Sequence, residues 1–225
     1  MQKEQEFTDK ISELISKYSS VNSAVTKALT IHEIHKILLK VPISRLQSIL
    51  SSIYTPSFSA LLLEQSQLHE PYSYFCYRIL DHLCFVPSIR EKIVSQGAVK
   101  TCLEAIKSTN YEKTISALSL LTSTLGVQEV YLDFIENQGI KLLYNLLQTT
   151  EIEYIFYILR IFDWLLNSQK IYRDCLLHMG IADALKYNLK NNADLQKSLQ
   201  LFGQAKKIKD EIEILEDYYF NKAFN

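Results

Sequence analysis

Three stretches of this 225-residue chain read alike: residues 90–99 are REKIVSQGAV, residues 132–141 are LDFIENQGIK, and residues 173–182 are RDCLLHMGIA. Their glycines, Gly97, Gly139 and Gly180, recur about every 40 residues, and a period of this size is typical of stacked helical repeats. Each glycine is expected at a corner between two helices, where the backbone leaves right-handed helical geometry and a Cβ would clash with the packed neighbour.

Hydrophobic periodicity supports the same interpretation along the whole chain. Apolar residues recur at spacings of three and four, and the strict alternation of a half-buried strand is nowhere sustained. The chain contains 5 Gly and 4 Pro, too few for a turn-rich β fold or a glycine-rich phosphate loop. We therefore predict an all-α protein in which each repeat has two short helices around its glycine and a longer third helix. Gly126 and Gly203 are expected to close third helices.

The residues that follow the corner glycines form a recognisable block: Gly97-Ala98 with Cys102-Leu103, Gly139-Ile140 with Tyr144, and Gly180-Ile181 with Leu185, together with the pair Ala117-Leu118. This block resembles the armadillo repeat, whereas HEAT-like arrays share the repeat length but usually lack the corner glycine. The resemblance implies a right-handed α-solenoid of three-helix repeats with irregular capping helices at both ends. It also implies that the third helices line a concave, partner-binding groove.

One departure from the family narrows the expected function. Importin-like armadillo proteins carry a ladder of Trp and Asn on their third helices, which holds extended basic peptides. The matching Asn positions in this sequence are His82, Leu120 and Ile161, so a nuclear-import receptor is not expected.

The predicted organisation is one continuous domain with three regions. Residues 1–70 are expected to form N-terminal capping helices and a first irregular repeat, and residues 71–203 about three armadillo-like repeats. Residues 204–225 combine Lys and Asp/Glu with an apolar line, which predicts an amphipathic capping helix. A projecting helix that docks on another protein is the alternative for this segment.

Charge and composition exclude several classes of function. The chain has 24 Lys+Arg against 25 Asp+Glu, so no bulk basicity favours nucleic acid. It has neither an apolar run long enough for membrane insertion nor a signal-peptide pattern. We expect a cytoplasmic protein, with a cytoskeleton-associated role among the options. Reduced and buried thiols are expected for the four cysteines, which lie in apolar helical patterns without CxxC spacing: Cys76, Cys84, Cys102 and Cys175.

Candidate catalytic and metal-binding residues are few. His32 and His35 are three residues apart on one helix without a third ligand nearby, so we interpret them as partly exposed helix residues. Asp81 and His82 are adjacent and point about 100° apart, so they cannot form an acid/base dyad with each other. The sequence predicts a protein that is not an enzyme, with no cofactor and no metal site.

Stacking the third helices at an offset of about 41 residues aligns polar and aromatic side chains on one face. In the last of these helices Tyr157, Arg160 and Trp164 continue that face as one stripe, and Tyr, Trp and Arg dominate interface hot spots. The alternative is that a neighbouring repeat or the C-terminal helix covers Tyr157 and Trp164. The predicted partner-binding residues are Arg78, Asp81, His82, Thr122, Tyr157, Arg160, Trp164 and Asn167.

The expected function is that of a non-catalytic scaffold or adaptor, which binds a protein or peptide partner through the concave face. A regulatory subunit or co-chaperone that clamps a folded enzyme, such as a protein kinase or an ATPase, is the alternative.

Overall fold

The computed structural model describes residues 2–68, 72–147 and 151–168, and within these ranges every regular element is an α-helix. The prediction of an all-α protein is confirmed for this part of the chain. The chain divides into two compact units, Met1–Asn137 and Gln138–Asn225.

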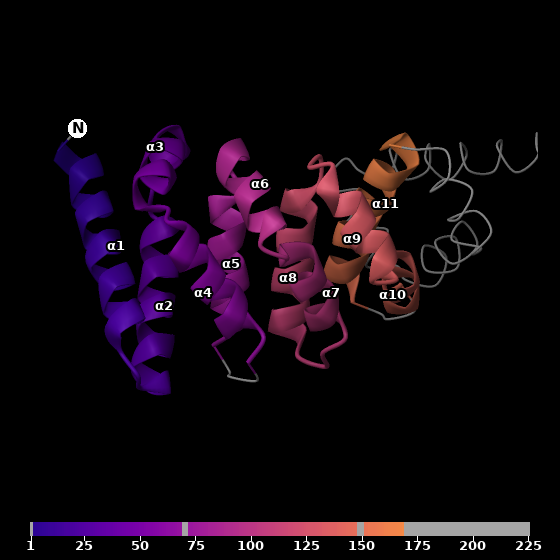
Figure 1. Cartoon of the computed structure of the whole chain (residues 1–225), viewed down its shortest axis with the longest axis horizontal. Coiled ribbons are helices and arrows are strands. Elements are labelled where there is room, and N and C mark those ends of the chain that lie inside the picture. The colour runs from indigo at the N-terminus through magenta and orange to yellow at the C-terminus, as the bar shows by residue number, and fades with distance from the viewer. Residues whose placement is uncertain (1, 69–71, 148–150, 169–225) are drawn as a thin grey trace, which may run out of the picture. The chain divides into compact units, whose positions relative to one another are not determined.

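The first unit contains the helices from α1 to α9 (Figure 1). They are α1 (Gln2–Ser20), α2 (Ala24–Leu38), α3 (Ile43–Ile53), α4 (Pro56–Ser66), α5 (Tyr74–Leu83), α6 (Pro87–Ser95), α7 (Ala98–Ile106), α8 (Tyr111–Thr124) and α9 (Glu129–Glu136). The described part of the second unit contains α10 (Gly139–Leu146) and α11 (Ile152–Ser168).

The helices of the first unit repeat a three-helix arrangement. α4 packs on α5 and α7 packs on α8, and α1 packs on α2 in the same way. α5 contacts both α2 and α8, so α2, α5 and α8 follow one another as a layer in chain order (Figure 1). We call α2, α5 and α8 the third-helix layer of the first unit.

Polar residues and prolines in the breaks of the pattern begin the helices. The side chains of Ser23, Thr55 and Asn110 each accept a hydrogen bond from the backbone N–H three residues later. Such a cap is worth about 1 kcal/mol. Pro56 and Pro87 are the first residues of α4 and α6, where a missing N–H costs little.

The corner glycines agree with the prediction at one position and differ at the next. Gly97 lies between α6 and α7 with φ +89°, and Gly126 follows α8 with φ +93°. A Cβ at Gly97 would meet nothing within 4 Å, so the expectation of a clash is wrong and the backbone conformation alone favours glycine. Gly180 and Gly203 lie outside the described residues.

The second corner begins one residue earlier than predicted. Gln138 has φ +55° and occupies the left-handed region, whereas Gly139 is the first residue of α10. The expectation that Gly139 itself leaves right-handed helical geometry is therefore wrong, because the helix already includes it.

The core of the first unit is built from the apolar faces of its helices. Tyr18, Phe58, Tyr77 and Phe134 are among the largest fully buried side chains. The thiols of Cys76, Cys84 and Cys102 are free and buried, as predicted, and burial raises the pKa of Cys76 to about 12. Cys175 lies outside the described residues.

Two other expectations concern the chain as a whole. Among the described helices, none has the length and apolar character needed to cross a bilayer. The predicted regions 1–70, 71–203 and 204–225 stay a prediction, and the segment 204–225 lies outside the described residues.

Candidate partner-binding surface

α5 has one buried face and one partly exposed face. Its buried residues are Phe75, Cys76, Tyr77, Ile79, Leu80 and Leu83. The helical spacing leaves Arg78, Asp81 and His82 partly exposed on the other face. The structure therefore brings these three predicted residues together on one helix of the third-helix layer.

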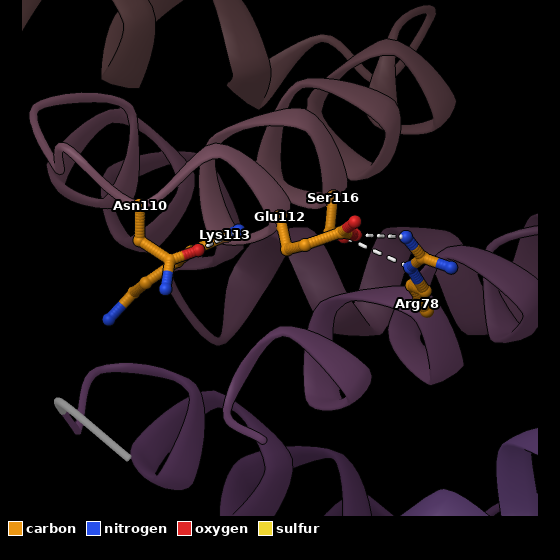
Figure 2. Close-up of polar contacts among 5 residues, drawn as sticks. All are labelled: Arg78, Asn110, Glu112, Lys113 and Ser116. Atoms are coloured by element: carbon orange, nitrogen blue, oxygen red, sulfur yellow. Dashed lines mark hydrogen bonds and ion pairs between the residues drawn. The ribbon is translucent and has the colours of Figure 1, made fainter. Parts of the chain in front are cut away.

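Arg78 connects α5 to α8. Its Nη2 donates to Glu112 Oε2 at 2.6 Å, and its Nε donates to Ser116 Oγ at 3.1 Å (Figure 2). The guanidinium carbon also lies 5.2 Å from the centroid of the Tyr74 ring. The side chains of Arg78 and Glu112 are 38% and 48% exposed, so water screens the ion pair and its worth is about 0.5 kcal/mol. A partner would thus meet an arginine that already has a carboxylate and a hydroxyl as partners.

Asp81 forms a second connection between the same helices. Its Oδ2 accepts a hydrogen bond from Ser119 Oγ at 2.7 Å, and its Oδ1 accepts one from Ser123 Oγ. These serines are four residues apart, so they lie one turn apart on the same face of α8. Sequence reasoning did not assign Glu112, Ser116, Ser119 or Ser123 to the site. The signal that could have found the last three is their polar character at positions 116, 119 and 123, a spacing that follows one helix face.

Three histidines lie where α2 meets α5: His32 and His35 contact Phe75, and His35 also contacts His82. We call His32, His35 and His82 the histidine cluster. The His32 ring stacks on Phe75 with centroids 4.6 Å apart, and the His35 ring lies 5.3 Å from Phe75 and 5.7 Å from His82. His35 is 5% exposed. The interpretation of both α2 histidines as partly exposed is therefore wrong for His35, because α5 covers its ring.

Burial also sets the charge of this cluster. Burial, together with the nearby His82, Arg78 and His32, lowers the pKa of His35 to about 4. Burial lowers the pKa of His82 as well, against the opposing effect of Asp81. Both imidazoles are consequently neutral at pH 7. Within the described residues no group of three or more His, Cys, Asp or Glu side chains is placed to hold a metal ion.

Thr122 differs from the other predicted residues of the first unit. Its side chain is 9% exposed, and its hydroxyl donates to the carbonyl of Leu118 at 2.9 Å. The hydroxyl is therefore satisfied within α8, and the side chain is covered.

A groove of about 660 Å³ on the first unit is lined by Gln67, Lys100, Thr101, Glu104, Lys107 and Lys113, among others. Lys113 is buried, and its Nζ donates to the carbonyls of Gln67 and Leu68 at 3.4 and 3.1 Å. Lys107 pairs with Glu104 at 2.7 Å. Lys113, which follows the N-cap Asn110 on α8 (Figure 2), thus joins the end of α4 to α8 and has a structural role.

α11 presents the predicted stripe of the second unit. The buried residues of this helix include Ile155, Ile158, Leu159, Phe162 and Leu165. Arg160 is exposed, and Tyr157 and Trp164 are partly exposed. The Arg160 guanidinium carbon lies 5.9 Å from the centroid of the Phe156 ring. The side chain of Asn167 lies outside the described part of the chain.

Comparison with known proteins gives structural matches only. No protein-family model matches the sequence, and no curated protein matches it. An engineered protein solved by the Northeast Structural Genomics Consortium matches with a TM-score of 0.70 and 16% identity. That match covers 90% of this chain, which spans about half, 47%, of the engineered protein.

Two further matches are designed armadillo repeat proteins. One was solved in complex with the peptide (KR)4, and the other was designed computationally for modular peptide recognition. Each has a TM-score of 0.68 and 14% identity, and each alignment covers 87% of this chain and 81% of the designed protein. The chain therefore has an armadillo-like α-solenoid fold, as the corner glycines and their following residues indicated.

Proposed function

We propose that the chain is a non-catalytic scaffold or adaptor, which binds a protein or peptide partner through the faces that its third helices present. Repeat proteins suit this role, because each unit contacts only its neighbours and leaves an extended surface for a partner. The likeness to designed armadillo proteins made for peptide recognition supports the proposal at the level of the fold.

The observation that carries the proposal is the stripe on α11. Tyr157, Arg160 and Trp164 follow one another at spacings of three and four, and all three retain exposure while the opposite face of the helix is buried. Aromatic and arginine side chains in such a stripe bury large areas at low entropic cost and keep a polar group for a hydrogen bond.

For the first unit taken by itself, the proposed surface is formed by Arg78, Asp81 and His82 on α5. Because Arg78 and Asp81 already bind α8, their contribution is to present a preorganised polar surface. Thr122 is left out of the proposed surface because its side chain is covered. Asn167 stays a prediction.

The test compares Arg160→Glu with Lys141→Glu, a matched charge reversal at an exposed lysine of α10. Tagged full-length proteins capture partners from a lysate of the native cell, and each captured protein is then purified and its affinity measured. A partner that uses the α11 stripe should bind Arg160→Glu about 30-fold more weakly, a loss of about 2 kcal/mol. It should bind Lys141→Glu as well as it binds the unmodified chain.

Thermal melting of the same variants separates binding from folding. Equal binding by all three proteins would contradict a role for the α11 stripe. A large drop in melting temperature for Arg160→Glu would show instead that Arg160 is a structural residue.

A further inference from the structure

We infer that the outward face of α2 is a docking site for an acidic amphipathic helix of a partner protein. The inference rests on the proposed scaffold function, because α2 belongs to the same third-helix layer as α5. It goes further by assigning a different set of residues and the chemistry of the partner.

α2 is apolar on two opposite faces. One face is buried and includes Thr30, Ile31, Ile34, Ile37 and Leu38. The opposite face carries Val25, Leu29 and Leu39, which are 70%, 60% and 63% exposed. A surface helix normally turns polar residues to water, so a line of exposed aliphatic side chains indicates an interaction site.

Four exposed residues and one partly exposed histidine form a single stripe. Val25, Leu29, His32, Lys36 and Leu39 are spaced by four, three, four and three residues, which keeps them on one side of a helix. The His32 ring also stacks on Phe75 of α5. We call these five residues the α2 stripe. At 1.5 Å per residue the stripe is about 21 Å long, the length of a four-turn helix. Apolar anchors at this spacing are how a groove or helix face receives an amphipathic helix.

The charges along α2 select the partner. Lys36 and Lys40 are exposed, and neither forms an ion pair within the described residues. The one carboxylate of the segment 24–40, Glu33, lies 3.8 Å from Lys10 Nζ. The stripe therefore offers lysine charge without a matching carboxylate, which favours Asp and Glu on the partner and disfavours a basic peptide.

An anionic membrane would also favour exposed aliphatic side chains beside lysines. The neighbouring helix argues for a protein helix, because the exposed face of α5 carries Asp81 and the Arg78–Glu112 ion pair. A bilayer that covered this layer would remove water from these charges at a high cost. A single helix can lie along α2 and leave them hydrated.

The inference is tested with a displayed library of unbiased 16-residue peptides, selected for binding to the full chain. Selected peptides should carry apolar residues at spacings of three and four and an excess of Asp and Glu. Leu29→Asp should weaken the binding of a selected peptide by at least 10-fold, and Lys36→Glu by about 3-fold or more, with the Lys36 effect decreasing at high salt. Leu132→Asp, a matched change at a leucine of α9 that is 68% exposed, should leave binding unchanged.

Several results would overturn the inference. Selection of basic peptides, or binding that neither Leu29→Asp nor Lys36→Glu changes, would remove the α2 stripe as the docking site. Binding of the chain to vesicles with 30% phosphatidylserine that Leu29→Asp abolishes would assign the stripe to a membrane. Peptides that lose affinity in Arg160→Glu but not in Leu29→Asp would leave the scaffold function standing and refute the α2 assignment.

Discussion

Replacing His35 with phenylalanine should remove much of the loss of stability that the protein shows in acid. The His35 ring is 5% exposed and lies against Phe75 and His82, and burial lowers the pKa of His35 from 6.5 to about 4. The folded protein therefore holds the neutral imidazole, whereas the unfolded chain takes up a proton near pH 6.5. Stability from this difference is fully present above pH 6.5 and is lost as the pH falls toward 4.

The magnitude follows from the two pKa values. Each unit of difference corresponds to 1.36 kcal/mol, so His35 alone should lower the free energy of unfolding by about 2 kcal/mol at pH 5 and by about 3 kcal/mol below pH 4. This is a large share of a typical domain stability of about 5–15 kcal/mol. Phenylalanine keeps a flat ring of similar size against Phe75 but cannot take up a proton.

The measurement is urea unfolding, followed by circular dichroism at several pH values between 7.5 and 4.5. Between pH 7 and pH 5 the unmodified protein should lose about 2 kcal/mol more than His35→Phe. His82→Phe should also reduce the loss, since burial lowers the pKa of His82 in the same direction. If the unmodified protein and His35→Phe lose stability in parallel, His35 is not held neutral in the folded state and the reasoning is refuted.

Three other predictions follow from local geometry. Gly97→Ala should lower the free energy of unfolding in urea by about 1–2 kcal/mol, because φ of Gly97 is +89°. Gln138→Gly should leave this free energy unchanged or raise it by up to about 1 kcal/mol. Equal losses of stability in both variants would argue against the left-handed conformation at these two positions. Cys76, Cys84 and Cys102 should react with a thiol reagent only after denaturation, since all three are buried. Because the chain has one other cysteine, Cys175, two or more fast thiols in the native protein would contradict this. A double-mutant cycle of Arg78→Met with Glu112→Gln should give a coupling of about 0.5 kcal/mol that falls at 1 M salt, and a coupling that salt leaves unchanged would show that water does not screen the pair.

The repeat architecture was predictable because it depends on local rules. The glycine spacing, the 3.6-residue periodicity and the polar breaks at Ser23, Thr55 and Asn110 act within one helix or one turn. The left-handed conformation of Gln138 was not predictable from such local rules. Which of Gln138 and Gly139 has a positive φ depends on the residue at which α10 begins, and the sequence alone does not give that residue.

The hydrogen-bond partners of Arg78 and Asp81 were harder to predict, because they depend on how α5 and α8 are positioned relative to each other along their axes. Aligning the repeats at an offset of 41 pairs Arg78 with Ser119. In the structure Arg78 binds Ser116, 38 positions later in the chain, and Ser119 binds Asp81 at the same offset of 38. Asp81 also binds Ser123, 42 positions later, so the contacts fall on both sides of the alignment offset. Sequence spacing gives the face of a helix but not which residues of the neighbouring helix a side chain reaches.

These contacts between helices also change which residues are available to a partner. The sequence pattern favours Arg78 and Asp81 as partner-binding residues, yet both form hydrogen bonds that connect α5 to α8. His35 is a polar residue, yet its ring is buried where α2 packs on α5. Val25, Leu29 and Leu39 are aliphatic, as core residues usually are, yet they are exposed. Because Arg78 and Asp81 of α5 are engaged within the layer, the exposed aliphatic residues of the α2 stripe are the apolar surface that this layer offers a partner to remove from water. Substitutions on α2 should therefore affect binding with little effect on the stability of the α5–α8 pair.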